Sequence, residues 1–131
     1  MARAPDDVGG VMTPRVVTVS PSDDVQLALR AMLEHDIGAV VVVDDGRPVG
    51  IFTERDVTRR VLDDAELLRR SVSDVMAAPV VTIPATTDVV AAFELLNSRG
   101  IRRLPVVEDG RLVGIVTERD LLRWVGRVAR E

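Results

Sequence analysis

Hydrophobic residues along the chain gather in short β-branched runs that alternate with stretches of helical spacing. The runs at residues 16–19 and 39–43 predict strands, and the second is so nearly all apolar that it predicts burial on both faces. Between them, apolar residues from Val25 to Leu33 recur every three or four positions, which predicts an amphipathic helix. Ser22 is the expected N-cap of this helix, followed by acidic residues that suit its first turn.

A hairpin and a second helix complete the pattern. The residues Asp44-Asp45-Gly46-Arg47 predict a tight turn in which Gly46 supplies a positive φ. Residues 49–52 predict the return strand, and a helix is expected to begin at Thr53. The predicted order is therefore strand, helix, strand, strand, helix.

The same pattern occurs twice, without a gap, at an offset of 64 residues. Val11-Met12 aligns with Val75-Met76, and Thr86 is the expected helix cap of the second copy. We therefore expect a mixed α+β fold in which two β-α-β-β-α repeats pack with pseudo-twofold symmetry into one module. The predicted divisions are a flexible N-terminal tail at 1–7, a first repeat at 8–62, a helical connector at 63–74 and a second repeat at 75–128.

Composition narrows the classes of function. The chain has 131 residues, of which 47% are hydrophobic, and a formal charge of −4, which favours one folded module over a disordered chain. It has no cysteine and one histidine, which excludes disulfides, thiolate zinc sites and His-cluster metal sites. A mildly acidic chain with few aromatic residues is atypical of nucleic-acid binders, so no nucleic-acid partner is expected. No apolar run is long enough for a membrane span or a signal peptide, so a cytoplasmic protein is expected.

The most informative motif is Gly-hydrophobic-hydrophobic-Thr-x-x-Asp, which occurs at residues 50–56 and 114–120. A Thr followed three residues later by an acid is a capping box, and helix capping alone explains one such motif. The motif also stands at a strand-to-helix junction, where free backbone N–H groups and the helix dipole favour an anion. The Thr hydroxyl can bond a phosphate oxygen there, and the Asp can accept both hydroxyls of a ribose. The residues by themselves leave both interpretations open.

Taken in order, these motifs make the chain resemble tandem CBS domains, the paired module named after cystathionine β-synthase and also called a Bateman module. The resemblance runs from about Val8 to Val128 and includes the segment Ile101-Arg102-Arg103-Leu104-Pro105-Val106-Val107. It implies a regulatory module, not an enzyme, that binds AMP, ADP, ATP, S-adenosylmethionine or NAD in two clefts between the repeats. It implies Mg²⁺ only as a companion of ATP, and signalling to a regulated protein through the geometry of a homodimer. The alternative is a ligand-free protein-interaction module in which the Thr-x-x-Asp motifs only cap helices.

The resemblance also assigns two sets of binding residues, each drawn from both repeats. In each set the Asp holds the ribose hydroxyls, the Thr lies near the phosphate and the base lies between aliphatic side chains. The first set is Thr13, Val17, Thr18, Ile37, Ala39, Ile115, Thr117, Arg119 and Asp120. The second set is Ile51, Thr53, Arg55, Asp56, Ala77, Val81, Thr82, Ile101 and Arg103, with Arg102 as a neighbouring cation. Arg102 and Arg103 suit bidentate phosphate binding, and equally they suit an edge strand that resists aggregation.

The last helix predicts an interface with a second copy of the chain. Leu121, Leu122, Trp124, Val125 and Val128 form an apolar stripe that is wider than the usual core face of a helix. We therefore expect part of the stripe to pack against the second copy, with Trp124 as the anchor. The alternative is that this helix only covers its own sheet.

Overall fold

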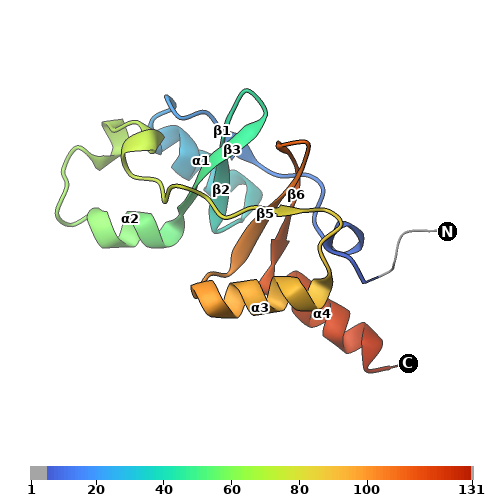
Figure 1. The fold of residues 1–131 in the computed structure, drawn as a ribbon. Coiled ribbons are helices and arrows are strands. Elements are labelled where there is room, and N and C mark those ends of the chain that lie inside the picture. The colour runs from blue at the N-terminus through green and yellow to red at the C-terminus, as the bar shows by residue number, and fades with distance from the viewer. Residues whose placement is uncertain (1–5, 131) are drawn as a thin grey trace. The chain divides into compact units, whose positions relative to one another are not determined.

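The computed structural model describes residues 6–130, which divide into two compact units (Figure 1). Unit 1 combines the described residues up to Val16 with those from Val81 onwards, and unit 2 runs from Val17 to Val80. Each unit therefore contains parts of both sequence repeats, because the start of each repeat joins the unit that holds most of the other repeat.

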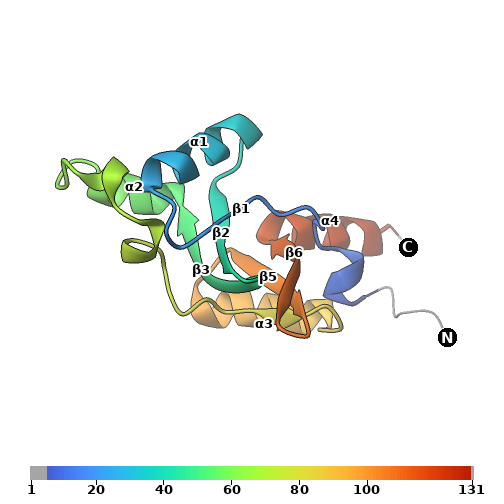
Figure 2. The ribbon, with the colours of Figure 1, turned by 90° about the horizontal axis from the view of Figure 1, so that it is seen from above.

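Unit 2 is a three-stranded sheet with two helices (Figure 2). Its elements are β1 (Thr18–Val19), α1 (Val25–His35), β2 (Ala39–Asp44), β3 (Arg47–Thr53) and α2 (Glu54–Arg60), followed by 3₁₀ turns at Leu67–Arg69 and Val72–Asp74. The sheet order is β1-β2-β3, with β1 parallel to β2 and β2 antiparallel to β3. The predicted order of strands and helices is confirmed.

Unit 1 repeats this architecture. It has a 3₁₀ turn at Val8–Gly10 and then β4 (Ile83–Pro84), α3 (Val89–Arg99), β5 (Arg103–Glu108), β6 (Arg111–Thr117) and α4 (Glu118–Val128). Its sheet order is β4-β5-β6, with the same parallel and antiparallel pairings. The elements α3, β5 and β6 lie 64 residues after α1, β2 and β3, so the offset found in the sequence is also the offset of the structure.

Both hairpins turn on an Asp-Gly pair with positive φ at each residue. Asp45 and Gly46 have φ of 52° and 79°, and Asp109 and Gly110 have φ of 52° and 78°. Two successive residues with positive φ are typical of a type I′ turn, whose twist matches that of the flanking strands. The conformation predicted for Gly46 is confirmed.

The helices α1 and α3 begin later than the sequence predicts. Asp24 and Asp88 are their N-caps, and the two carboxylates accept hydrogen bonds from backbone N–H groups of the first turn at 2.8 and 2.7 Å. The predicted caps, Ser22 and Thr86, are wrong by two residues. A carboxylate is the stronger acceptor because its hydrogen bond is charge-assisted, which favours the later start.

Each unit has its own hydrophobic core. In unit 2, Val25, Ala28 and Met32 of α1 are buried at the predicted helical spacing. All three residues at 40–42 of β2 are at most 1% exposed. Successive strand side chains point to opposite faces, so both faces of β2 are covered, as predicted. No helix among residues 6–130 combines the length and the hydropathy that a membrane crossing requires.

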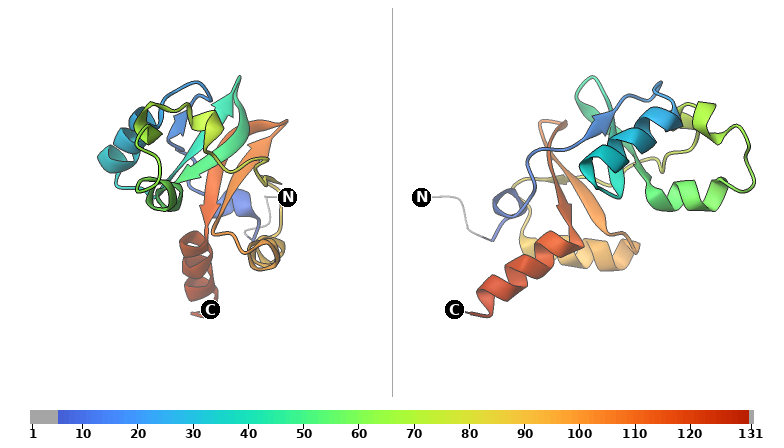
Figure 3. Two further views of the ribbon diagram at one scale, coloured as in Figure 1. Left: turned by 90° about the vertical axis from the view of Figure 1, so that its left-hand side faces the viewer. Right: turned by 180° about the vertical axis from the view of Figure 1, so that it is seen from behind.

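The residues just before the first repeat are held by unit 1 (Figure 3). Asp7 is 8% exposed, and its carboxylate accepts a hydrogen bond from the Gly10 backbone N–H at 3.1 Å. The Asp6 carbonyl accepts from the Val89 N–H at 2.8 Å, and its carboxylate accepts from Trp124 Nε1 at 3.3 Å. The flexible tail predicted at 1–7 therefore does not extend to Asp6 and Asp7, because both are bonded to the unit; residues 1–5 lie outside the described residues.

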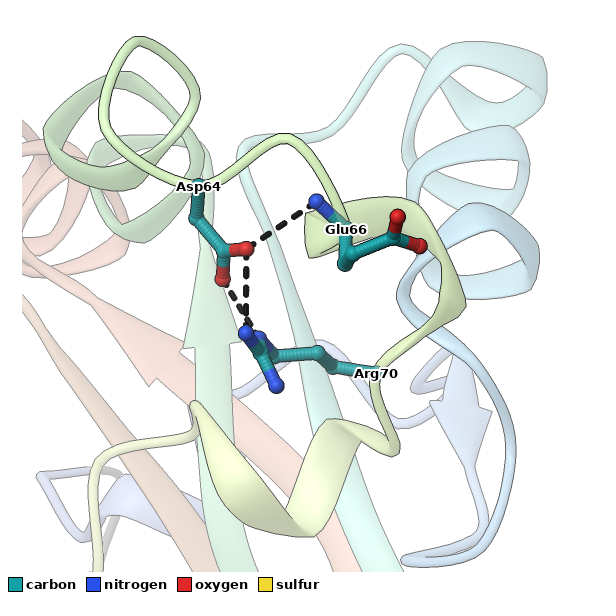
Figure 4. A network of polar contacts seen from close by, with 3 residues as sticks. All are labelled: Asp64, Glu66 and Arg70. Atoms are coloured by element: carbon teal, nitrogen blue, oxygen red, sulfur yellow. Dashed lines mark hydrogen bonds and ion pairs between the residues drawn. The ribbon is translucent and has the colours of Figure 1, made fainter.

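The connector predicted as helical at 63–74 contains two 3₁₀ turns instead of an α-helix. The Asp64 carboxylate accepts hydrogen bonds from the Glu66 backbone N–H at 3.0 Å and from Nε and Nη2 of Arg70, the latter at 3.1 Å (Figure 4). The Arg70 guanidinium lowers the pKa of the Asp64 carboxyl below its usual value near 3.8, and Asp64 raises the pKa of Arg70. The hydrogen bonds of Asp64 with Glu66 and Arg70 thus hold this loop together.

Candidate functional site

The second Thr-x-x-Asp motif joins β6 to α4 in unit 1. Thr117 is the N-cap of α4, and its hydroxyl accepts a hydrogen bond from the Asp120 N–H at 3.2 Å. In return, Asp120 Oδ2 accepts from the Thr117 N–H at 2.9 Å and from the Thr117 hydroxyl at 3.0 Å. Asp120 is only 8% exposed, and its Oδ1 lies 3.7 Å from Nη1 of Arg123. The motif is therefore a complete capping box with an acid at a nearly buried position.

The first Thr-x-x-Asp motif has the same geometry in unit 2. Thr53 is the N-cap of α2, and its hydroxyl accepts from the Asp56 N–H at 3.4 Å. Asp56 Oδ2 accepts from the Thr53 N–H at 2.8 Å and from its hydroxyl at 3.1 Å. The capping interpretation is thus correct for both motifs. In each box the Asp carboxylate accepts two hydrogen bonds, both at Oδ2, and the third bond of the motif is accepted by the Thr hydroxyl. The Oδ1 atom takes no part in the capping bonds.

A short segment from the start of each repeat lies alongside the strand that leads into each box. In unit 1, the backbone N–H of Thr13 donates to the Ile115 carbonyl at 2.9 Å, and that of Ile115 donates to the Thr13 carbonyl at 2.9 Å. In unit 2, Ile51 and Ala77 exchange the equivalent pair of bonds at 3.1 and 2.9 Å. We call residues 12–13 and 76–77 the crossing segments. They bring Thr13 and Ala77 to the strands that carry the boxes.

The arginines predicted to bind phosphate lie in unit 1, at the start of β5 and in the first turn of α4. Arg103 is paired with Thr117 across β5 and β6, and the Arg102 carbonyl accepts from the Glu118 N–H at 3.0 Å. The Arg102 side chain is exposed and lies 3.9 Å from a Glu118 carboxylate oxygen. Arg119 is exposed in the first turn of α4. Arg102 and Arg103 thus lie next to the Thr117 box, whereas the resemblance assigns Arg103 to the set of Asp56.

The remaining predicted residues divide between the two units. In unit 2, Val17 packs on the core and Thr18 pairs with Val41 of β2. Ala39 pairs with Thr53 across β2 and β3. Ile37, just after α1, and Arg55, in α2, are exposed. In unit 1, Val81 and Ile101 pack on the core, and Thr82 is half-buried beside β4. Each predicted set draws residues from both units, and their combination into two sites stays a prediction.

Three contacts near the boxes were not predicted from the sequence. Met12 lies over Gly114 and Met76 lies over Gly50, where a Cβ on the glycine would meet the methionine side chain. Asp120 has an ion-pair partner in Arg123, three residues along α4. The Val-Met repeat was the available signal for the methionines, but it carries no information about which residue they contact.

The interface predicted on α4 needs a correction. Leu121 is fully buried in the core of unit 1, and Trp124 packs inward, with its ring 6.2 Å from that of Phe93. Leu121 is therefore not available to a second copy, whereas Trp124 is half-buried and its role as an anchor stays a prediction. The exposed apolar side chains of α4 are Leu122, Val125 and Val128, at 64%, 45% and 43% exposure. We call these three residues the α4 stripe.

No group of three or more His, Asp or Glu side chains in the part of the chain from residue 6 to 130 is arranged to hold a metal ion. The acids at the helix starts are used as caps, and Asp64 is engaged with Arg70. Among these residues, the Thr-Asp boxes remain as the candidate site.

Comparison with known families decides what kind of module this is. The family model of the CBS domain matches the chain at residues 8–63 and again at residues 72–127. The chain is a tandem pair of CBS domains. This membership confirms the resemblance found in the sequence, and it extends over both repeats.

Individual relatives agree with the family match. The pair is 40% identical over 122 residues to the uncharacterized protein MK0525 of Methanopyrus kandleri, which covers 88% of this chain and 61% of that protein. It is 37% identical to the CBS domain-containing protein YhcV of Bacillus subtilis, over 87% of this chain and 81% of that one. The chain thus spans less than two thirds of the first relative and most of the second.

Two solved structures with bound ligands share the fold of this CBS pair. CBSX2 in complex with AMP matches with a TM-score of 0.83 and 30% identity, over 94% of this chain and 98% of that chain. The CBS domain pair of MJ0100, in complex with 5′-methylthioadenosine and S-adenosylmethionine, matches with a TM-score of 0.82 and 26% identity, over 93% and 97%. Both of these relatives bind compounds that contain adenosine.

Proposed function

We propose that this CBS pair is a regulatory module that binds adenosine-containing nucleotides through its two Thr-Asp boxes and catalyses no reaction itself. The observation that carries the proposal is the geometry of the boxes. Each places a Thr hydroxyl and an Asp carboxylate at the N-terminus of a helix that follows a strand, and each leaves one carboxylate oxygen outside the capping bonds.

The carboxylates of Asp56 and Asp120 suit recognition of a ribose. Their Oδ2 atoms are held by the Thr N–H and hydroxyl, so the direction of the carboxylate is fixed before a ligand arrives. The Oδ1 atom can then accept hydrogen bonds from the 2′- and 3′-hydroxyls. Because the acid is already oriented, binding costs little side-chain entropy.

The phosphate and the base need different surroundings. The phosphate would lie near Thr53 or Thr117, where the first turn of the helix favours an anion and an exposed arginine follows at Arg55 or Arg119. Arg102 and Arg103 have Gly38 and Ala39 as their counterparts in unit 2, so the two sites would differ in their preference for additional phosphates. The base would be held by aliphatic side chains, since neither predicted set contains an aromatic residue.

The relatives support an adenosine ligand and leave its identity open. AMP is bound by CBSX2, and S-adenosylmethionine with 5′-methylthioadenosine is bound by MJ0100. AMP, ADP, ATP, NAD and S-adenosylmethionine are therefore the compounds to test, with Mg²⁺ present when ATP is used. Such a sensor would act in the cytoplasm, where these compounds are abundant.

One observation favours a second candidate function. Both boxes are complete without a ligand, because the Thr and the Asp satisfy each other's backbone N–H groups. The chain would then be a protein-interaction module in which the boxes only start α2 and α4. The two functions differ in their response to nucleotides.

Calorimetric titration of the purified, nucleotide-free protein with each compound separates these candidates. A sensor gives saturable heat with at least one adenosine compound and no heat with GMP at the same concentration. An interaction module gives no heat with any of them at millimolar ligand, and its melting temperature is unchanged by all of them.

We also propose that signalling uses a homodimer formed through the α4 stripe. Three apolar side chains spaced three residues apart on an exposed helix face suit a second copy of the same helix. In sedimentation velocity, we expect the wild type to be a dimer and Val125→Glu to be a monomer. Val90→Glu is the matched control, because Val90 is 52% exposed on α3 and carries the same change. A wild-type monomer at micromolar concentration, or a Val125→Glu dimer, contradicts this interface.

A further inference from the structure

The two glycines of the Thr-x-x-Asp motifs are covered by methionines from the crossing segments. A Cβ added to Gly114 would meet the Sδ of Met12, its Cγ at 3.0 Å and the Thr13 carbonyl at 3.0 Å. A Cβ added to Gly50 would meet the Sδ of Met76, its Cγ at 2.9 Å and the carbonyl of the next residue at 3.1 Å. A side chain at either glycine would therefore force the methionine side chain to move and the backbone carbonyl to shift by a few tenths of an ångström.

Strand geometry links this contact to the opposite face of the sheet. Residues 114 and 116 of β6 share one face, and Val116 on that face is fully buried in the core of unit 1. Ile115 and Thr117 lie on the other face, which leads into the box. Met12 packs on the core, and the next residue of the crossing segment exchanges two hydrogen bonds with Ile115. The same alternation holds in unit 2, where Phe52 is buried beside Gly50 and the crossing segment bonds Ile51.

We propose that the Met12–Gly114 and Met76–Gly50 contacts are positioning devices for the nucleotide sites. Each methionine holds a crossing segment against the core. Because the glycine has no side chain, it allows the segment to lie close to the strand that leads into the Thr-Asp box. That distance fixes where the backbone of Thr13 or Ala77 stands relative to the Thr-Asp pair. The role at the ligand rests on the proposed function, whereas the role in holding the crossing segment does not.

Backbone hydrogen bonds from Met12 to the Val8 carbonyl and from Met76 to the Val72 carbonyl hold one end of each crossing segment, whereas its contact with the strand of the box is short. Each pairs with its strand through a single isolated bridge of two backbone hydrogen bonds. A bridge of two backbone hydrogen bonds opens easily unless side-chain packing stabilises it. Met12 and Met76 pack on the core clusters next to Val11 and Val75, and each is the core-packed side chain that stands directly before the exposed Thr13 or Ala77.

The decisive variant is Gly114→Ala, with Gly126→Ala as its matched control. Gly126 lies in α4 with no atom within 4 Å of an added Cβ, so the same substitution there meets open space. We expect Gly114→Ala to reduce the hydrogen-exchange protection of the Thr13 and Ile115 amides by about tenfold. The Ile51 and Ala77 amides keep their protection and serve as an internal control.

The second readout is the affinity for AMP, measured by calorimetry in the same variants. Gly114→Ala weakens AMP binding by about tenfold at one site, and Gly126→Ala leaves it unchanged. The double variant Met12→Ala/Gly114→Ala loses clearly less than the sum of the two single losses, because both substitutions act through the same contact. Losses of stability at two independent positions would simply add.

The outcomes separate the two proposals. If the wild type binds no adenosine compound, the proposed function fails, and hydrogen exchange still decides the positioning role. If Gly114→Ala keeps the protection of Thr13 and Ile115, or if the losses of Met12→Ala and Gly114→Ala simply add in the double variant, the positioning role is overturned. If Gly114→Ala does not fold, Met12→Ala alone decides: we expect it to lower protection at Thr13 and Ile115 only, and an equal loss at Ile51 and Ala77 overturns the proposal.

Discussion

The Asp120 carboxylate gives the most direct prediction about stability. Replacing it with alanine removes the acceptor of two hydrogen bonds, from the Thr117 N–H at 2.9 Å and from its hydroxyl at 3.0 Å. The neighbouring Leu121 is fully buried, so fraying of the first turn of α4 would disturb the core of unit 1. Loss of a capping interaction costs about 1 kcal/mol and up to about 2 where the site is well ordered. We therefore expect Asp120→Ala to lower the free energy of unfolding by about 1–2 kcal/mol.

Urea unfolding followed by circular dichroism measures this change, with Glu118→Ala as the matched control. Glu118 lies in the same helical turn and carries the same charge, but its side chain is 60% exposed and makes only a 3.9 Å ion pair with Arg102. An exposed pair of this kind contributes about 0–1 kcal/mol. The urea concentration at the midpoint of unfolding should fall clearly further for Asp120→Ala than for Glu118→Ala, and the dependence of the unfolding free energy on urea concentration should stay the same. Equal midpoints for the two variants would refute the reasoning that the box stabilises α4.

Two further predictions concern single positions in unit 2. Asp36 follows the last residue of α1 and has a φ of 52°, whereas Gly100 follows α3 with a φ of 61°. Because glycine adopts a positive φ without strain, Asp36→Gly should raise the free energy of unfolding by about 0.5–1 kcal/mol in the same urea assay. A lower free energy of unfolding contradicts this prediction. Asp64 has a lowered pKa because of Arg70, so its contribution to stability is present above the unfolded-state pKa and is lost as the pH falls through the folded-state pKa. Asp64→Asn should therefore lower the melting temperature at pH 7, and its difference from the wild type should shrink as the pH falls below the usual carboxyl pKa of 3.8. A difference in melting temperature that stays constant in acid contradicts a stabilising role of the Asp64–Arg70 contact.

The repeat and the local elements could be predicted from the sequence because each depends on near neighbours in the chain. The periods of the apolar residues predicted the strands and helices, and the Asp-Gly pairs predicted tight hairpin turns with a positive φ at glycine. The Thr-x-x-Asp spacing gave both capping boxes for the same reason, since all of its hydrogen bonds join residues three apart or closer.

The pairing of distant segments could not be predicted in this way. Thr13 bonds Ile115 across about a hundred residues, and no local pattern indicates that the start of the first repeat joins the sheet of the second. The covering of Gly114 by Met12 follows from that pairing and was invisible for the same reason. The inward packing of Trp124 likewise depends on Phe93 and Asp6, which come from other parts of the chain.

The central claim is that the two Thr-Asp boxes bind adenosine nucleotides, and calorimetric titration of AMP into the two Asp variants tests it most directly. The wild type should bind AMP, and Asp56→Ala and Asp120→Ala should each lose the heat of about one site, since each removes one ribose-binding carboxylate. Glu118→Ala, which changes the same charge beside the box, should bind like the wild type. Undiminished AMP binding by Asp56→Ala and Asp120→Ala, or no binding by nucleotide-free wild type at millimolar AMP, would contradict the claim.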